Sequence, residues 1–578
     1  MNPPARPPAS LQARFAATIL VAVMVGMIGV MWATQAAFEA GLRPELDRKA
    51  VVVGASIGEL TGKAIDHGLA LPELVGVRAH LDAVRDEHRE LAYLALRDAA
   101  GGVLFDSGRA EPGPGVEVPI VRQGRRIGAV QVQVGAAWVR DILLQSALDL
   151  VVVFVVAMFL TRELLHGITG TGAGARIAAP AGAAALARLR MPLFLFMLAE
   201  ELTRAFLPGY ARSLMPPASA LAPDILAGVP IVAFMLVVAL GQPVLASWSE
   251  RAGHRRTMSF GAVLGVVGLA GAALASGIGG FIAWRALCGL GYGMVFVAGQ
   301  GLVLEHTAPA ERTRGFALFV GAILVAGVCG PPIGGILADH LGPRWGFAVA
   351  AATAAVAWLA VRGLPDDRAR DPAQAAGAPT LRDFARLFRH GRFLHVTVLA
   401  ALPAKLMLAG ACFYLVPVYV IAAGAPPSVA GRALMLYAVV LVLAMPQATR
   451  WVERGVPLAR LVGTGLAVSS LGGFAFVAWQ GVAPVYLVTA LLGLGQGLSI
   501  AAQSSLLAQV CAAEIDAHGS GPAFGAYRLV ERLGNACGPL VAGALAATIG
   551  HAAAFVAMSA LILACGLVFL LLAREARP

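Results

Sequence analysis

Long apolar stretches separated by short polar connectors make up most of this 578-residue chain. A helix rises about 1.5 Å per residue, so about 20 apolar residues cross the ~30 Å hydrocarbon core of a bilayer. From Met191 onward such stretches recur twelve times, at about residues 191–211, 225–247, 258–278, 281–305, 315–338, 346–363, 393–421, 429–449, 459–478, 484–508, 523–549 and 552–573. The pattern predicts an all-α membrane protein whose twelve-helix bundle has two six-helix halves, residues 191–363 and 393–578, joined by a cytoplasmic loop over 364–392.

Two further apolar stretches precede the bundle and flank a polar segment. The first, about residues 15–37, follows Arg6 and Arg14, and we interpret residues 1–38 as a cytoplasmic tail and an uncleaved anchor. Residues 39–140 are polar and of mixed charge; a helical pattern over 73–91 and strand patterns over 91–108 and 125–135 predict a small α+β extracytoplasmic domain. A second anchor and a Gly/Ala-rich cytoplasmic linker fill residues 141–190.

The composition favours a protein that is surrounded by the lipid bilayer over one that binds nucleic acid. Hydrophobic residues make up 58% of the chain and charged residues 13%, whereas soluble proteins average about 25% charged residues. The formal net charge is +11, but the basic residues stand in short clusters between apolar stretches, as in cytoplasmic loops of membrane proteins. We therefore expect a multi-pass protein of a bacterial inner membrane.

Chemistry-bearing motifs of enzymes are missing from the sequence. The six cysteines lie in or beside apolar stretches and show neither metal-ligand spacing nor a disulfide framework. No GxxxxGK[ST] phosphate-binding loop is present, which argues against a pump driven by ATP. No nucleophile–base constellation stands in the polar regions, so we expect no enzymatic activity and no cofactor.

Three short matches recur in both halves of the bundle. Pro243 and Pro446 each stand 7 residues before a Glu-Arg pair. GLGYG begins 46 residues after Pro243 (289 − 243), and GLGQG begins 47 residues after Pro446 (493 − 446). Cys-Gly-Pro follows at 86 (329 − 243) and 91 (537 − 446). The shared order indicates a duplication, as in transporters whose halves rock against each other.

One connector carries a recognisable charged motif. ASWSERAGHRR, between the second and third bundle helices, resembles the GxxxDRxGRR signature of the major facilitator superfamily, with Ala246 in place of the first glycine and Glu250 in place of aspartate. In that family an acid at a helix end with arginines across the turn locks the two halves together on the cytoplasmic side. The expected cytoplasmic gate comprises Glu250, Arg251, Gly253, Arg255, Arg256, Glu453 and Arg454.

Two bundle helices carry further family-like motifs. FIAWRALCGLGYG resembles RxxxGxG, with Arg285 and Gly289 in place. GVCGPPIGG resembles the antiporter motif GxxxGPxxGG, with Ala326 in place of the earlier glycine. Small residues let helices approach closely, and proline bends a helix. The expected residues of this antiporter-motif helix are Gly330, Pro331, Gly334 and Gly335.

Charged residues inside apolar stretches are the candidates for a transport site, since a charge near the bilayer centre costs at least about 2.5 kcal/mol unless it faces a cavity or a partner. By helical spacing Arg204 shares a face with either neighbouring glutamate, and Lys405 either pairs with Glu531 across the bundle or faces the cavity. The set is Glu200, Glu201, Arg204, Arg285, Lys405, Arg528 and Glu531.

The combined motifs resemble the twelve-helix drug/proton antiporters of the major facilitator superfamily. That resemblance implies alternating access, with protons and a small-molecule substrate as partners, and it favours export of an amphipathic, zwitterionic or anionic compound; which of Glu200 and Glu201 carries the proton stays open. Residues 39–140 resemble PAS-like or Cache-like sensor domains in their order of elements, which makes a small ligand of this domain a further candidate partner. A membrane sensor with a transporter-like bundle and a proton-coupled importer remain as alternatives.

Overall fold

The computed structural model describes residues 43–88, 90–111, 115–171, 181–217, 219, 221–307, 312–364, 387–512, 514–515 and 520–575, with scattered positions between 18 and 41. The expected first anchor therefore lies largely outside the described residues, as do parts of the linker before residue 191 and most of the loop over 364–392. The chain divides into two compact units, Met1–Ala157 and Met158–Pro578.

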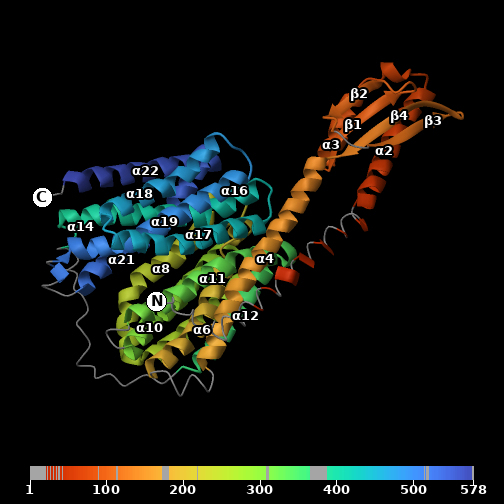
Figure 1. The fold of residues 1–578 in the computed structure, drawn as a ribbon. Coiled ribbons are helices and arrows are strands. Elements are labelled where there is room, and N and C mark those ends of the chain that lie inside the picture. Colours follow the sequence, from red (N-terminus) through yellow and green to blue (C-terminus); the bar gives the residue numbers. More distant parts are fainter. Residues whose placement is uncertain are drawn as a thin grey trace, which may run out of the picture. The chain divides into compact units, whose positions relative to one another are not determined.

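The first unit is built on a four-stranded antiparallel sheet with the strand order β2-β1-β4-β3 (Figure 1). Its strands are β1 (Leu91–Asp98), β2 (Val103–Gly108), β3 (Val116–Arg122) and β4 (Arg125–Val134). The helix α3 (Val77–Glu87) and strands β1, β2 and β4 lie where the sequence predicts them. The helix α2 (Arg43–Asp66) and the strand β3 were not predicted; β3 is an edge strand that contains an exposed proline, a residue that weakens strand patterns.

The core of this unit lies between α2 and the sheet. Ala50, Val53 and Ile57 recur on one face of α2 at helical spacing, and they join buried aliphatic residues of β1, β3 and β4. A glycine on the same face lets the helix approach closely, since a Cβ at Gly54 would lie 2.8 Å from a methyl carbon of Val118. The helix and the sheet therefore form one packed body.

One helix, α4 (Ala136–Thr171), follows β4 directly and corresponds to the predicted second anchor. Eleven helices within the described residues are long and apolar enough to cross a membrane. One of them is the segment Ala136–Glu163 of α4, and the other ten coincide with predicted bundle helices.

The ten bundle helices that are long enough to span a membrane follow one another along the second unit. They are α8 (Pro223–Ala252), α9 (His254–Ala273), α10 (Ile278–His306), α11 (Arg312–Leu341), α12 (Pro343–Val361), the segment Gly391–Ala422, α17 (Pro427–Glu453), α18 with η7 (Leu458–Leu471 and Gly472–Val477), α19 (Ala483–Val510) and α22 (His551–Glu575).

Two other predicted bundle helices are present as helices but are not among these eleven. The first predicted one is split: α6 (Ala181–Leu202) ends at a turn, and α7 (Leu207–Ser213) continues the segment. In that turn the hydroxyl of Thr203 donates to the carbonyl of Glu200, which competes with helical hydrogen bonding. The other, α21 (Ser520–Ile549), contains Arg528, Glu531 and Arg532. The count of twelve spanning helices thus stays a prediction.

The segment Gly391–Ala422 is not a uniform α-helix. Its elements are α14 (Gly391–Val396), the π-helix η5 (Thr397–Ala401), α15 (Leu402–Met407), the π-helix η6 (Leu408–Leu415) and α16 (Val416–Ala422). Short π-helical turns inside α-helices are rare and occur frequently at functional sites. Lys405 stands on α15, between the two π-helical turns.

The two halves of the bundle meet through equivalent helix pairs, α11 with α17 and α8 with α21, and Figure 1 shows the earlier and later helices as two groups. A Cβ at Gly431 of α17 would lie 2.5 Å from the carbonyl oxygen of Pro331 on α11. In the equivalent position, a Cβ at Gly228 of α8 would lie 3.1 Å from the carbonyl oxygen of Pro539 on α21. Both prolines belong to the Cys-Gly-Pro repeats, so the packing agrees with the internal duplication.

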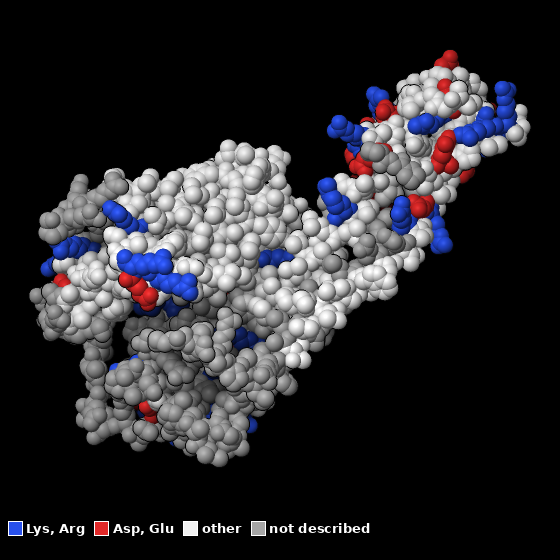
Figure 2. Space-filling view, viewed as in Figure 1, with Lys and Arg blue, Asp and Glu red and all other residues white. Residues whose placement is uncertain are grey.

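Charged side chains are distributed differently over the two units. In Figure 2 the visible side of the first unit carries many charged side chains of both signs. The visible side of the bundle is mainly uncharged, and its charged groups gather toward one end. An uncharged flank suits contact with hydrocarbon.

Candidate functional site

A buried ion pair joins two helices of the first half. Glu200, on the last turn of α6, accepts a hydrogen bond from Nη1 of Arg285 on α10, with 3.1 Å between Nη1 and Oε2. The two side chains are only 4% and 6% exposed. The guanidinium also lies over the ring of Phe234 on α8, 4.7 Å from its centroid. Arg285 therefore does not reach the surface but is neutralised inside the bundle.

The neighbouring glutamate has a different partner. Oε2 of Glu201 lies 2.7 Å from Nε of Arg204, three residues further along the same segment. The guanidinium of Arg204 lies 4.0 Å from the ring centroid of Phe413 on η6, which belongs to the other half. Of the two glutamates that Arg204 could have paired with by spacing, it pairs with Glu201, and it contacts both halves of the bundle.

A small cavity of about 40 Å³ lies at these side chains. Its lining residues come from both halves and are Glu200, Arg204, Leu207, Ile231, Phe234, Met235, Arg285, Tyr292 and Phe413. Glu200 borders the cavity whereas Glu201 does not. Oε1 of Glu200 is buried and accepts no hydrogen bond from the described residues. The cavity is thus bordered by a carboxylate that has one unused hydrogen-bond acceptor among the described residues.

The second half holds a three-membered charge cluster. Nζ of Lys405 lies 3.3 Å from Oε1 of Glu531, and Nη1 of Arg528 lies 2.8 Å from Oε2 of the same carboxylate. Of the two alternatives for Lys405, the structure has the pair with Glu531. Arg532, one residue further on α21, lies over the ring of Phe296 on α10 at 5.4 Å, which is a second contact between the halves.

Glycines of the antiporter-motif helix α11 lie against the segment that carries the glutamates. A side chain at Gly330 would meet the Cβ of Glu201, and one at Gly334 would meet the carbonyl of Leu202. On another side of the helix a Cβ at Gly335 would lie 2.8 Å from the carbonyl oxygen of Pro427, at the start of α17. The motif therefore packs α11 closely against both α6 and the other half.

The predicted cytoplasmic gate residues lie at the α8–α9 connector and at the end of α17. Gly253 has a φ of +94°, a conformation that favours glycine and that makes the sharp turn between the two helices. Arg255 donates to the carbonyl of Arg362 after α12. For Glu250 and Glu453 no ion pair is found among the described residues. The charge relay expected from the motif thus stays a prediction.

A cluster that sequence reasoning missed lies where α8 begins. The carboxylate of Asp224 pairs with Arg212 of α7 and lies 3.1 Å from Nε2 of His551, the first residue of α22. The hydroxyl of Tyr414 on η6 donates to the backbone carbonyl of Asp224. The cluster therefore ties the two halves together at this end of the bundle.

A second missed pair links α4 to the first bundle helix. Glu163 of α4 is 1% exposed and forms two hydrogen bonds with Arg190 of α6, one of them 2.7 Å long. The sequence signal for this pair was a carboxylate, Glu163, inside an apolar stretch. Its partner Arg190 could not be identified from the sequence because it lies 27 residues away, beyond the linker. Among the described residues, no group of three His, Cys, Asp or Glu side chains could hold a metal ion.

Comparisons with known proteins agree on the kind of fold. The family model described as Major Facilitator Superfamily matches residues 193–521 and 422–578, and thus more than half of the chain. The chain is similar to solved structures of the peptide transporter POT in complex with sulfate (16% identity, TM-score 0.55, 68% of this chain and 94% of that one). It is also similar to a bacterial homologue of the human lysosomal transporter Spinster in an inward-facing and occupied conformation (13% identity, TM-score 0.56, 69% and 98%). These similarities show the fold alone.

Curated relatives match over shorter stretches. The chain is 24% identical over 169 residues to the chloramphenicol resistance protein CraA of Acinetobacter baumannii, which covers 29% of this chain and 41% of that protein. It is 25% identical over 114 residues to multidrug resistance protein 3 of Bacillus subtilis and 25% identical over 117 residues to the multidrug export protein EmrB of Escherichia coli. Each of these two alignments covers 20% of this chain and 22% of the relative. The matches thus span less than half the length of these relatives.

Proposed function

Because this chain belongs to the Major Facilitator Superfamily and is a multi-pass membrane transporter, we propose that it is a proton-coupled exporter of a small amphipathic or anionic molecule. Export by alternating access between two six-helix halves needs a substrate and a coupling ion to meet near the middle of the bundle. The observation that carries the proposal is the cavity at Glu200, Arg204 and Arg285, which both halves line.

Glu200 is the proposed proton carrier. Its side chain borders the cavity and has one oxygen, Oε1, without a hydrogen-bond partner among the described residues. The neighbouring Glu201 lies against α11 and is neutralised within its own segment. A proton entering from outside converts the Glu200 carboxylate to the neutral acid and removes its attraction for Arg285. The protonated bundle then turns to the cytoplasmic side and releases the proton there. The restored carboxylate binds a donor group of the substrate, and the next proton from outside displaces that group.

Contacts between the two halves support the proposal that the bundle is closed at one of its ends in this structure. Asp224 pairs with His551, and the carboxylate of Asp339 accepts a hydrogen bond of 3.0 Å from the backbone N–H of Ser428. By the predicted topology, both contacts lie at the outer end. The motif residues around Glu250 and Glu453 then form the cytoplasmic gate when the bundle opens to the other side. In this account the structure is closed outside, and the outer contacts break during each cycle.

Direction and substrate class rest on two further observations. CraA, multidrug resistance protein 3 and EmrB are named for resistance or export, which favours export for a chain similar to them. The cavity and the cluster around Lys405 contain both cations and carboxylates, set beside aromatic rings, which suits amphipathic compounds with an anionic or zwitterionic group. The host membrane in this proposal is a bacterial inner membrane.

The domain assignment belongs to the same proposal. Residues 39–140 form a sensor-like extracytoplasmic domain, flanked by the anchors within 1–38 and 141–190, and the bundle halves are 191–363 and 393–578 with the 364–392 loop between them. The support is that residues up to Ala157 form a compact unit with its own sheet and core. Glu163 and Arg190 supply a buried connection from the second anchor to the bundle.

Transport into everted membrane vesicles tests this function. Vesicles with an acidic interior are given radiolabelled chloramphenicol, ethidium or decanoate, which differ in charge. We expect uptake of at least one amphipathic compound that is abolished by a protonophore and by Glu200→Gln, and reduced by Lys405→Ala. Uptake that is unaffected by the protonophore would refute proton coupling, and uptake only into right-side-out vesicles with an acidic exterior would identify an importer.

A further inference from the structure

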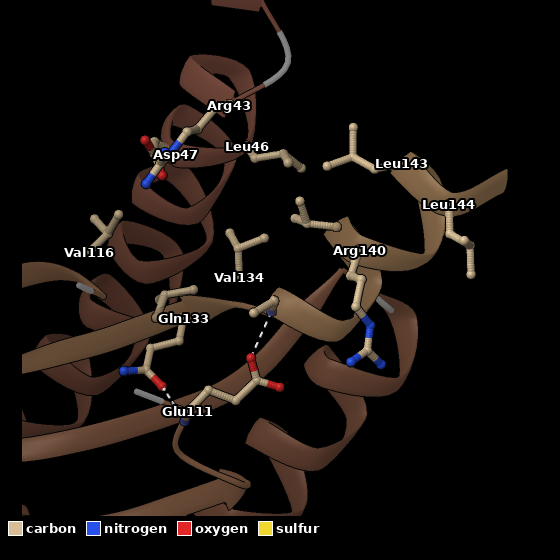
Figure 3. Close-up of a pocket in the computed structure, with 13 residues that line it drawn as sticks. Arg43, Leu46, Asp47, Glu111, Val116, Gln133, Val134, Arg140, Leu143 and Leu144 are labelled. Carbon is tan, nitrogen blue, oxygen red and sulfur yellow. Dashed lines mark hydrogen bonds between the residues drawn. The ribbon is translucent and has the colours of Figure 1, made fainter. Parts of the chain in front are cut away.

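The first unit contains a pocket that no motif predicts (Figure 3). Its walls are the first turns of α2, the residue Glu111 before β3, the end of β4 and the first turns of α4. Its volume is about 600 Å³, within the range of about 300–1,000 Å³ that is usual for small-molecule sites. The pocket lies wholly within the unit Met1–Ala157.

The centre of the pocket is aliphatic. In Figure 3 the side chains of Leu46, Val134 and Leu143 approach one another across it. The aliphatic lining comprises Leu46, Val116, Val132, Val134, Val139, Leu143 and Leu144. Such a lining removes apolar surface of a ligand from water, which is worth about 25 cal/mol per Å² buried. The body of a ligand that fits here is therefore apolar.

Four charged residues stand around this apolar centre, two of each sign. Arg43 and Asp47 stand one turn apart on α2 and carry opposite charges. The carboxylate of Glu111 accepts a hydrogen bond of 2.7 Å from the backbone N–H of Ala136, where the positive end of the α4 dipole lies. These three formal charges sum to −1, and the Glu111 carboxylate is held at the N-terminus of α4.

Arg140 carries the fourth charge. It lines the pocket from the second turn of α4, and it has no ion-pair or hydrogen-bond partner among the described residues. A guanidinium presents up to five donors in a planar fork, which matches a carboxylate, sulfonate or phosphate group. Although the formal charges of the pocket sum to zero, Arg140 is a cation whose donors are available to the acidic group of a ligand.

We propose that this pocket binds an amphipathic organic anion, with its apolar body among the aliphatic side chains and its acidic group at Arg140. The position on α4 suits such a ligand, because Leu143 and Leu144 belong to the first turns of a helix that is apolar enough to enter a membrane. Amphipathic anions concentrate at a membrane surface. The ligand is either a free amphiphile or an anionic lipid, which share this chemistry.

Binding of decanoate to the full-length protein tests the proposal. The protein is reconstituted in phosphatidylcholine nanodiscs, and saturable binding of radiolabelled decanoate is measured after subtraction of binding to empty nanodiscs. Arg140→Ala removes the acid-binding group, and Val139→Trp fills the apolar centre from α4. The matched control is Arg125→Ala, which removes an exposed arginine of β4 that does not line the pocket.

We expect decanoate to bind at least tenfold more weakly to Arg140→Ala and to Val139→Trp than to the wild type, and equally well to Arg125→Ala. Unlabelled decanoate should displace the probe, whereas decyltrimethylammonium, with a similar chain and the opposite charge, should not. Saturable binding that persists in both pocket variants belongs elsewhere in the protein and would overturn the proposal. So would displacement by the cation.

A second arm separates the two sources of the ligand. The same measurement is made in nanodiscs that contain phosphatidylglycerol. Weaker decanoate binding there, with no such effect in Arg140→Ala, identifies an anionic lipid as the occupant. Unchanged binding identifies a free amphiphile. Both results keep the site and its chemistry, and neither depends on whether the bundle exports or imports.

Discussion

Replacing Glu200 by glutamine removes one charge of the most deeply buried ion pair at the cavity. The variant keeps the size of the side chain but leaves the guanidinium of Arg285 without its carboxylate, in surroundings where both side chains are at most 6% exposed. With 3.1 Å between the bonded atoms and an effective dielectric constant of about 20, the lost attraction is about 5 kcal/mol. Breaking buried ion pairs typically destabilises proteins by roughly 3–5 kcal/mol, which agrees.

Part of that loss is offset. The amide oxygen of glutamine still accepts a hydrogen bond from the guanidinium of Arg285, and a hydrogen bond to a charged group is worth about 1.5–3 kcal/mol. We therefore expect Glu200→Gln to lower the free energy of unfolding by about 3 kcal/mol. A proton that crosses a membrane gains about 2.3 kcal/mol per 100 mV. A proton driven by about 130 mV therefore supplies the ~3 kcal/mol of the pair.

The assay is thermal unfolding of the purified full chain in detergent, with Glu201→Gln as the matched control. Glu201 pairs with Arg204, which is 23% exposed and stands in the same segment, so we expect a smaller loss, about 1 kcal/mol. A double variant, Glu200→Gln with Arg285→Gln, leaves no charge unpaired and should recover much of the lost stability.

The reasoning would be refuted by either of two results. The first is a Glu200→Gln protein as stable as the wild type. The second is a double variant whose loss of stability equals the sum of the losses in Glu200→Gln and in Arg285→Gln. Independent effects add in this way, whereas the effects of two partners of one ion pair do not.

Three further predictions concern other parts of the molecule. Gly334→Ala should destabilise the bundle by about 1–3 kcal/mol, since its Cβ would meet a backbone carbonyl of α6. In the same unfolding assay Gly327→Ala, whose Cβ meets nothing within 4 Å, should not destabilise it, because alanine is the better helix former. Asp224→Asn should lengthen spin-label distances across the start of α8 and α22; unchanged distances would contradict a role in closing that end. In the first unit, burial raises the pKa of Glu90. The hydrogen bond and charge of Lys49, 2.5 Å away, help to lower this pKa by more than burial raises it, so the net shift is downward. The stabilisation is therefore complete above the ordinary glutamate pKa of about 4.3 and is lost as pH falls below it; hydrogen exchange of β1 should rise there, and Lys49→Ala should abolish this dependence.

The fold was predictable where apolar residues form long stretches in the sequence. Ten bundle helices and the segment Ala136–Glu163 of α4 are apolar over 19 or more positions, a signal that tertiary contacts do not change. The π-helical turns beside Lys405 were not predictable, because they alter the helix by one residue without changing its composition. The strand β3 was not predicted because its exposed proline weakens the strand pattern of the sequence.

The candidate site was predictable as a set of residues but only partly as a set of pairs. Pairs at helical spacing, such as Arg528 with Glu531, follow from one helix alone. The partner of Glu200 stands 85 residues away, and nothing in a single sequence indicates it. Asp224 looked like an ordinary acidic residue in the first turn of a helix, since its contact with His551 spans 327 residues.

The most direct test of the central claim, proton exchange at Glu200 during export, is to measure proton and substrate movement together in proteoliposomes containing a pH-sensitive dye. With a transported compound identified in vesicles, its addition to the side from which it is exported should drive protons in the opposite direction through the wild-type protein. In Glu200→Gln the compound should still exchange across the membrane, but without proton movement. Proton movement that persists in Glu200→Gln, or that runs in the same direction as the compound, would contradict the account.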